Sequence, residues 1–150
     1  MTGSIHPIVL IALVGAVIAI VAIVIACRVR VPLKLTLTSV LVSSMPSLLM
    51  LALFYSLAIH MYQSLGGWPT SIGERGFSSL LTTHAYIATD YFAILLLLSV
   101  IIWPVALLLC VIIRRWRGSV SCLGIHALSY LVCWGLLLLA PSQFLYWWWD

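Results

Sequence analysis

Imidazole and carboxylate groups surround the least apolar part of this chain. The group consists of His6, His60, Glu74, Arg75, His84 and Asp90. Zinc is bound by imidazole and carboxylate ligands, and two histidines from neighbouring helices can hold a haem iron. His84 and Asp90 stand six residues apart, about 600° of helix rotation, so we expect them on different faces of a helix. His60 and His84 are the candidate metal or haem ligands of this group.

A second group follows helical spacing, with steps of four, three and four residues: Cys122, His126, Ser129 and Cys133. Thiolate and imidazole could hold zinc or a haem iron, and Cys122 and His126 are the candidate ligands here. The chain has no C-x-x-C pair or other closed ligand motif. The simpler interpretation is that the cysteines pack as small apolar residues and that His126 hydrogen-bonds a neighbouring helix. The sequence identifies no cofactor.

Motifs of the common catalytic classes are absent from the sequence. We find no nucleotide-binding glycine loop, no H-E-x-x-H, no G-x-S-x-G and no pair of acids inside an apolar run. The missing motifs count against many enzyme classes. The missing charges in mid-membrane and the missing inverted repeat count against an ion-driven carrier.

The composition is that of a membrane protein. Hydrophobic residues make up 65% of the 150 residues and charged residues only 7%, whereas about a quarter of a soluble domain is charged. The formal net charge of +4 does not indicate nucleic acid as a partner, because the basic residues lie in short clusters beside apolar runs. Such clusters orient a protein in the lipid bilayer.

Apolar runs predict four helices, over residues 8–26, 35–60, 85–113 and 120–140, with an outer loop over residues 61–84. Each run is long enough to cross a bilayer. Together they occupy nearly all of residues 1–150, so we predict a single all-α transmembrane domain. Short inner turns favour an up-down four-helix bundle. Pro46 is expected to kink the second helix, supported by hydroxyls at Thr36, Ser39, Ser43 and Ser47.

We predict that the first apolar run, residues 8–26, is a transmembrane helix and not a cleaved signal peptide. The residues before it, MTGSIHP, contain no lysine or arginine, which a secretory signal would have. Val24 to Cys27 resembles a lipoprotein cleavage site but lacks the same basic leader. Lipidation at Cys27 is therefore the less favoured interpretation.

The basic residues set the orientation. The two short inner loops contain six of the seven: Arg28, Arg30, Lys34, Arg114, Arg115 and Arg117. The outer segments contain only Arg75, so we expect both termini on the outer side. The cysteines beside the basic clusters then face a reducing compartment and should be free thiols. We expect a multi-pass protein of the bacterial cytoplasmic (inner) membrane; the lack of asparagine, and hence of N-glycosylation sites, is compatible with that source.

Two stretches are candidates for helix packing and for anchoring. A row of small residues shares one face of the first helix: Ala12, Gly15, Ala19, Ala22 and Ala26. Such rows allow close helix contact in lipid, either inside the chain or with a partner. At the other end of the chain, Trp147, Trp148 and Trp149 match the aromatic belt at headgroup level.

The outer loop is a candidate contact surface. It mixes turn-forming glycines with apolar side chains, so we expect it to fold back on the bundle or lie in the interface. The surface would consist of Trp68, Glu74, Arg75, Phe77 and Asp90. We expect Asp90 in the first turn of the third helix, where the helix dipole favours a negative charge. An earlier start of that helix, between Ser78 and Thr83, is the alternative.

Three functions remain open from the sequence. The first is a non-catalytic structural or accessory subunit of a membrane protein assembly, or a homo-oligomer, in contact with the lipid bilayer. The second is a haem- or metal-binding membrane redox protein. The third is a small transporter or channel that uses the hydroxyl-rich face of the second helix.

Overall fold

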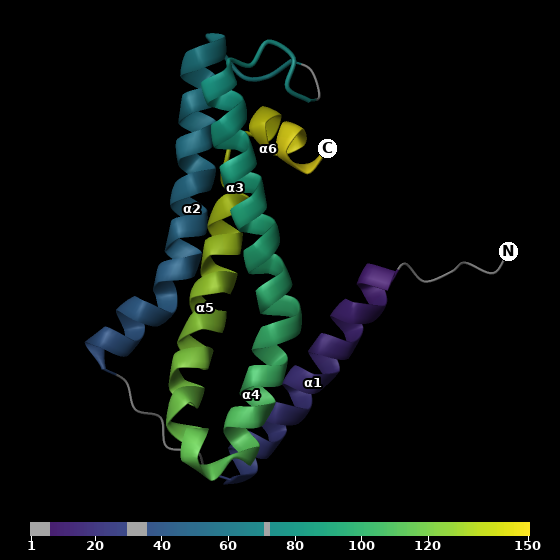
Figure 1. Cartoon of the computed structure of the whole chain (residues 1–150), viewed down its shortest axis with the longest axis vertical. Coiled ribbons are helices and arrows are strands. Elements are labelled where there is room, and N and C mark those ends of the chain that lie inside the picture. The colour runs from purple at the N-terminus through teal and green to yellow at the C-terminus, as the bar shows by residue number, and fades with distance from the viewer. Residues whose placement is uncertain (1–6, 30–35, 71–72) are drawn as a thin grey trace, which may run out of the picture. The chain divides into compact units, whose positions relative to one another are not determined.

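A computed structural model of the chain describes residues 7–29, 36–70 and 73–150, except for the side chains of residues 7–14 and 29. All its regular elements are helical, and the described ranges contain no strand (Figure 1). The α-helices are α1 (Pro7–Val29), α2 (Leu37–Leu65), α3 (Ser79–Leu97), α4 (Trp103–Ile112), α5 (Val120–Leu137) and α6 (Ser142–Trp149). Two shorter elements join them, the π-helical turn η1 (Leu98–Ile102) and the 3-10 helix η2 (Arg114–Ser119).

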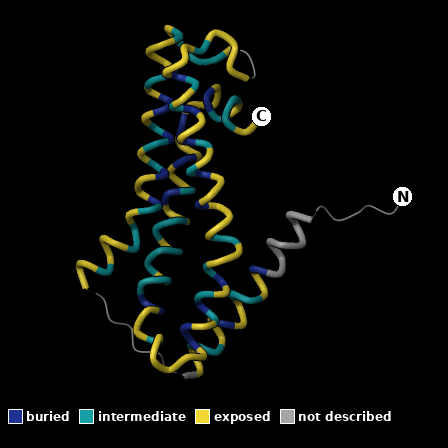
Figure 2. Tube along the Cα trace, viewed as in Figure 1, coloured by how far each residue is buried: buried dark blue, intermediate teal, exposed yellow. Residues whose placement is uncertain are grey.

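Within the part of the chain that the structure describes, three helices are long and apolar enough to cross a membrane: Leu37–Leu65, Ser79–Ile112 and Arg114–Leu137. A shorter apolar helix covers Gly15–Arg28. Many large apolar side chains on these helices are exposed, as the yellow stretches of Figure 2 show. Water would disfavour so much exposed apolar surface, whereas lipid tails accept it. The chain is therefore a multi-pass integral membrane protein.

The loop between α2 and α3 is shorter than the sequence predicts. It covers residues 66–78 and not 61–84, because α2 continues to Leu65 and α3 already begins at Ser79. Gly66 follows α2 with a φ of 69°, the left-handed conformation that ends many helices. Ser78 caps α3 by accepting a hydrogen bond from the Leu81 N–H at 3.2 Å. The capping residues determine where both helices end. The apolar runs used for the prediction are shorter than the helices, so the predicted loop is too long.

The helix predicted over residues 85–113 contains a π-helical turn. The Trp103 N–H donates a hydrogen bond to the carbonyl of Leu98, five residues earlier. Pro104 has no backbone N–H, so it cannot donate the usual helical hydrogen bond to the carbonyl of Val100. The regular helix ends at Ile112, since Ile113 is extended with φ −80° and ψ 105°.

The end of the chain forms a helix that the sequence did not predict. α5 ends at Leu137, and residues 138–141 separate it from α6. The tryptophans predicted as a simple interfacial tail, Trp147 to Trp149, lie on α6.

The chain divides into two compact units. Unit 1 contains residues 1–43 and 95–127, and unit 2 contains residues 44–94 and 128–150. The three boundaries, 43/44, 94/95 and 127/128, fall inside α2, α3 and α5, which explains why no linker composition marks them. The two units are described separately below.

In unit 1, α1 packs against η1 and α4 through its row of small residues. Gly15 and Ala22 are buried, and Ala19 and Ala26 are half-buried. A Cβ at Gly15 would collide with the carbonyl oxygen of Val100 and would lie 3.7 Å from Cγ of Pro104. The side chain of Ala12 lies outside the described residues. The row thus lets the backbones of two helices approach closely.

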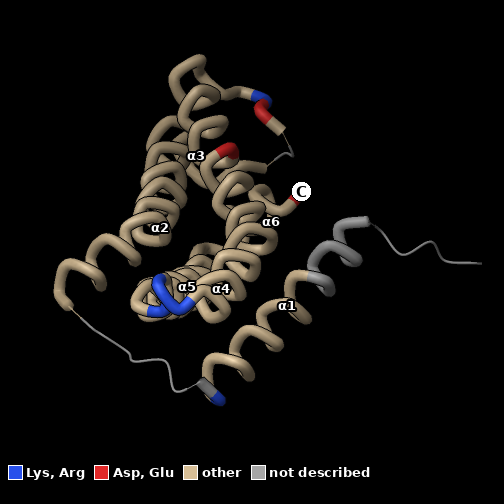
Figure 3. Tube along the Cα trace, turned by 60° about the horizontal axis from the view of Figure 1, so that its bottom comes forward, with Lys and Arg blue, Asp and Glu red and all other residues tan. Residues whose placement is uncertain are grey.

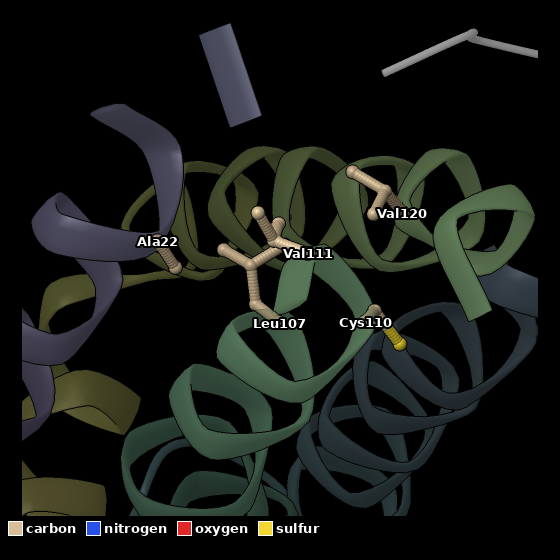
Figure 4. Close-up of a cluster of buried hydrophobic side chains, with 5 residues drawn as sticks. All are labelled: Ala22, Leu107, Cys110, Val111 and Val120. Carbon is tan, nitrogen blue, oxygen red and sulfur yellow. The ribbon is translucent and has the colours of Figure 1, made fainter. Parts of the chain in front are cut away.

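The core of unit 1 surrounds Ala22, with Leu107, Cys110, Val111 and Val120 (Figure 4). These side chains come from α1, α4 and the first residue of α5. The indole N–H of Trp103 donates to the carbonyl of Leu123 at 2.9 Å and so links α4 to α5.

In unit 2, aromatic rings form much of the core. Phe54 of α2 and Phe144 of α6 are fully buried, with ring centroids 5.0 Å apart. Phe92 of α3 lies 5.5 Å from Trp148. Two tyrosine hydroxyls join helices, since Tyr55 donates to the Leu136 carbonyl at 2.7 Å and Tyr91 to the Pro46 carbonyl at 3.0 Å.

Candidate functional site

His60 and His84 face each other across α2 and α3 in unit 2. His60 lies about one and a half turns before the end of α2, and His84 about one and a half turns after the start of α3. Their Nδ1 atoms are 2.9 Å apart and their ring centroids 5.2 Å. Both side chains are half-buried. The structure therefore brings together the two histidines that the sequence placed at the ends of the loop.

Ser56 completes a chain of hydrogen bonds with this pair. Its hydroxyl lies 3.1 Å from Nε2 of His84 and donates to the carbonyl of Leu53 at 3.0 Å. Because its one proton is directed at Leu53, the hydroxyl accepts from an Nε2–H of His84. Neutral His84 then carries its lone pair on Nδ1 and accepts from the Nδ1–H of His60. This assignment of protons satisfies all three hydrogen bonds at once.

The same assignment argues against serine chemistry. A nucleophilic serine needs a histidine nitrogen with a free lone pair to take its proton. Here Nε2 of His84 carries a proton and donates to Ser56. Ser56, His84 and His60 therefore do not form a catalytic serine–histidine arrangement. They form a chain of hydrogen bonds that ends at the Leu53 carbonyl.

The spacing of the two imidazoles suits a small ion better than a haem. Metal–imidazole bonds of about 2 Å place two axial haem ligands about 4 Å apart on opposite sides of the ring. The 2.9 Å between the Nδ1 atoms of His60 and His84 is too short for that arrangement. Among the residues that the structure describes, no three Cys, His, Asp or Glu side chains gather into a ligand cluster.

The candidate ligands on α5 belong to unit 1 and have structural partners. Nδ1 of His126 donates to the carbonyl of Ser43 at 3.2 Å. Cys122 is half-buried, and all four cysteines are free thiols. His126 thus joins α5 to α2, the role that the simpler interpretation gives it. His6 lies outside the described residues.

The loop residues separate into an inward and an outward set. Trp68 and Phe77 are half-buried, whereas Glu74 and Arg75 are exposed. The Tyr86 hydroxyl on α3 donates a hydrogen bond to the Glu74 carboxylate.

The predicted position of Asp90 is wrong. It lies about three turns into α3, whose first turn contains no acidic residue. The early start of α3 at Ser79 moves Asp90 away from the helix N-terminus, so the dipole argument does not apply. Asp90 is exposed, and Figure 3 marks the acidic position on α3 in red.

The loop and α6 form one aromatic surface layer. Its rings are Trp68, Phe77, Phe144, Trp147 and Trp148, and we call these residues, the loop 66–78 and α6 the aromatic cap. The indole N–H of Trp147 donates to the carbonyl of Gly73 at 3.1 Å. The Phe77 and Trp147 centroids lie 5.6 Å apart, and those of Trp68 and Phe144 6.2 Å. Trp149 is 48% exposed at the end of the cap.

Sequence reasoning missed two parts of this site. Ser56 precedes His60 by four residues, which places both on one face of α2. This spacing could have predicted that Ser56 lies beside the histidine pair. The packing of α6 against the loop had no such signal, because the aromatic-rich end also fits an interfacial tail.

Comparison of the chain with protein-family models, with curated proteins and with solved structures gives no match.

Proposed function

We propose that this chain is a non-catalytic integral membrane protein that acts as a structural or accessory subunit of a membrane protein assembly, with the aromatic cap as its contact surface. Four helices cross the membrane in this proposal, and both termini lie on the outer side. The basic residues of unit 1 support the orientation: exposed Arg28 lies in the last turn of α1, and Arg114, Arg115 and Arg117 lie on η2 (Figure 3). Arg30 and Lys34 of the same clusters lie outside the described residues.

The observation that carries this proposal is that described residues of the loop contact α6, while the polar side chains of Glu74 and Arg75 are exposed. Ring contacts and the bond from Trp147 to the Gly73 carbonyl hold the loop, while Glu74 and Arg75 stay exposed. A surface already ordered before binding loses little entropy when a partner docks. Tyrosine, tryptophan and arginine are also the residues most enriched at protein interfaces.

The small-residue row supports an interface less well than the cap does. Gly15 and Ala22 are buried against η1 and α4 of their own chain. A partner would have to displace that contact to use the row. A homo-oligomer formed through the cap remains within the proposal.

The hydroxyl-rich face of α2 gives little support to a transporter. Thr36 and Ser39 exchange backbone and side-chain hydrogen bonds of 3.0 and 3.1 Å, a capping box at the start of α2. Ser47 is fully buried and lies 3.4 Å from the hydroxyl of Ser129. These hydroxyls have structural partners and do not line a polar path.

Photo-crosslinking in the native membrane tests the proposal. A benzophenone amino acid replaces Arg75 or the 67% exposed Tyr146 of the cap, and Leu131 of α5, also 67% exposed, provides the matched control. We expect protein adducts from both cap positions and lipid adducts from Leu131. An adduct of twice the chain mass identifies a homo-oligomer. Lipid adducts alone from the cap, with a monomer in mild detergent, would contradict the proposal.

A further inference from the structure

We propose that His60 and His84 form a binding site for a divalent d-block ion that prefers imidazole ligands, with Cu²⁺ bound most tightly and Ni²⁺ or Zn²⁺ less so. The Nδ1 atoms of the two rings supply the protein ligands. The site is independent of the accessory role proposed above, because it does not involve the contact surface of the cap.

The distance between the two ring nitrogens is the first observation. Two imidazoles bound to one ion at about 2.0–2.1 Å have their nitrogens about 2.9 Å apart at a right angle and about 3.4 Å apart at a tetrahedral angle. The Nδ1 atoms of His60 and His84 are 2.9 Å apart. The ring centroids are 5.2 Å apart, so the two nitrogens point at each other, as in a hydrogen bond. To bind one tetrahedral ion, each ring would turn in place until the nitrogens are about 3.4 Å apart.

Proton balance also favours this site. In the assignment above, Nδ1 of His84 already carries a lone pair, and the only proton between the two nitrogens is that of His60. When this proton moves to Nε2 of His60, both Nδ1 atoms carry a lone pair that can bind an ion. Both rings stay neutral, so the ion replaces a hydrogen bond without a net loss of protons from the pair.

Ser56 provides the second observation. Histidines that bind metals usually donate their other ring N–H to an acceptor, which fixes the ring orientation and raises ligand basicity. Nε2 of His84 lies 3.1 Å from the Ser56 hydroxyl, which in turn donates to the Leu53 carbonyl. The orientation of His84 is thus set before any ion arrives.

Access and ligand number determine which ion is preferred. Both histidines are half-buried and Ser56 is exposed, and the pair lies about one and a half turns from the helix ends that border the loop. The described residues offer no cluster of three protein ligands, and water completes the coordination. With two nitrogen ligands and no imposed geometry, affinity follows the general order in which Cu²⁺ exceeds Ni²⁺ and Zn²⁺.

The test uses the full chain without a polyhistidine tag, in detergent or nanodiscs, titrated with Cu²⁺ alone. We expect one ion per chain by calorimetry and a nitrogen hyperfine pattern from two imidazoles in the electron paramagnetic resonance spectrum. His60→Ala and His84→Ala should each weaken binding at least tenfold and remove the two-nitrogen pattern. Ser56→Ala should keep that pattern and weaken binding on the order of tenfold.

Two controls use the remaining histidines. His126→Ala and His6→Ala should leave both affinity and spectrum unchanged, since His126 bonds to Ser43 and neither belongs to the pair. His60→Asn retains a polar side chain and guards against misfolding, with helix content measured by circular dichroism. The inference is overturned if Cu²⁺ does not bind, if binding survives in His60→Ala, or if folded His60→Asn binds as tightly as the unchanged chain.

Discussion

Unit 1 and unit 2 achieve close packing with opposite kinds of side chain. In unit 1, Gly15 and Ala22 let α1 approach η1 and α4 until backbone atoms touch. In unit 2, Phe54 and Phe144 fill the core, and tyrosine and tryptophan side chains donate hydrogen bonds to backbone carbonyls. The helices of unit 1 pack closely because the side chains at their contact are small, whereas large aromatic side chains fill the core of unit 2.

The difference has a physical cause. In lipid, water exclusion does not drive helices together, so contact must come from close packing or from hydrogen bonds. Small residues gain packing along the whole length of a straight helix. Aromatic residues can instead hold an irregular loop, because a ring covers much area and Trp147 also carries a donor for the Gly73 carbonyl. Unit 2 contains the loop, and unit 1 contains the contact of α1 with η1 and α4.

The largest effect is expected from removing a ring in unit 2. Phe144→Ala should destabilise unit 2 by about 3 kcal/mol, because it leaves a cavity beside Phe54, Trp147 and Trp148. Tryptic cleavage after exposed Arg75 measures release of the loop and should become several times faster.

The matched control for this change is Tyr146→Ala on the same helix, since Tyr146 is 67% exposed. It should leave the cleavage rate nearly unchanged. Equal acceleration by both substitutions would show that the ring of Phe144 does not hold the cap.

A smaller effect is expected from adding a side chain in unit 1. Gly15→Leu should cost about 1–3 kcal/mol, because its Cβ meets the Val100 carbonyl oxygen. The buried thiol of Cys110, next to Ala22 in the core, should then react faster with maleimide in a chain whose other cysteines are alanine. Gly124→Leu is the control, since no atom lies within 4 Å of its Cβ position. If both substitutions raise the reactivity equally, the close approach at Gly15 is not what holds α1.

The smallest effect concerns one hydroxyl. Tyr91→Phe removes the 3.0 Å hydrogen bond to the Pro46 carbonyl and should cost about 0.6–1 kcal/mol. Resistance to unfolding in mixed micelles of mild detergent and dodecyl sulfate measures this change. Tyr146→Phe on exposed α6 should give no loss. If Tyr91→Phe lowers the free energy of unfolding more than Gly15→Leu does, the hydrogen bond contributes more than the close backbone approach, and the expected order is wrong.

The apolar runs predicted the existence of the helices well and their ends less well. Hydropathy reports where lipid contact is favourable, whereas a helix continues until its backbone is capped. The capping residues Gly66 and Ser78 lie inside the predicted loop. Both helices therefore extend further than the apolar runs predict. The error at Asp90 has the same origin. The pairing of His60 with His84 could be anticipated only as a consequence of the loop joining their helices.

The sequence by itself determined that this is a membrane protein built from apolar helices, because composition and run length depend only on the residues present. It also determined which face of α1 has small residues. Only the tertiary structure decided that this face meets η1 and α4, that Ser56 bonds to His84, and that α6 folds over the loop. These contacts depend on the relative rotation and depth of helices far apart in the chain, which no local pattern of residues encodes.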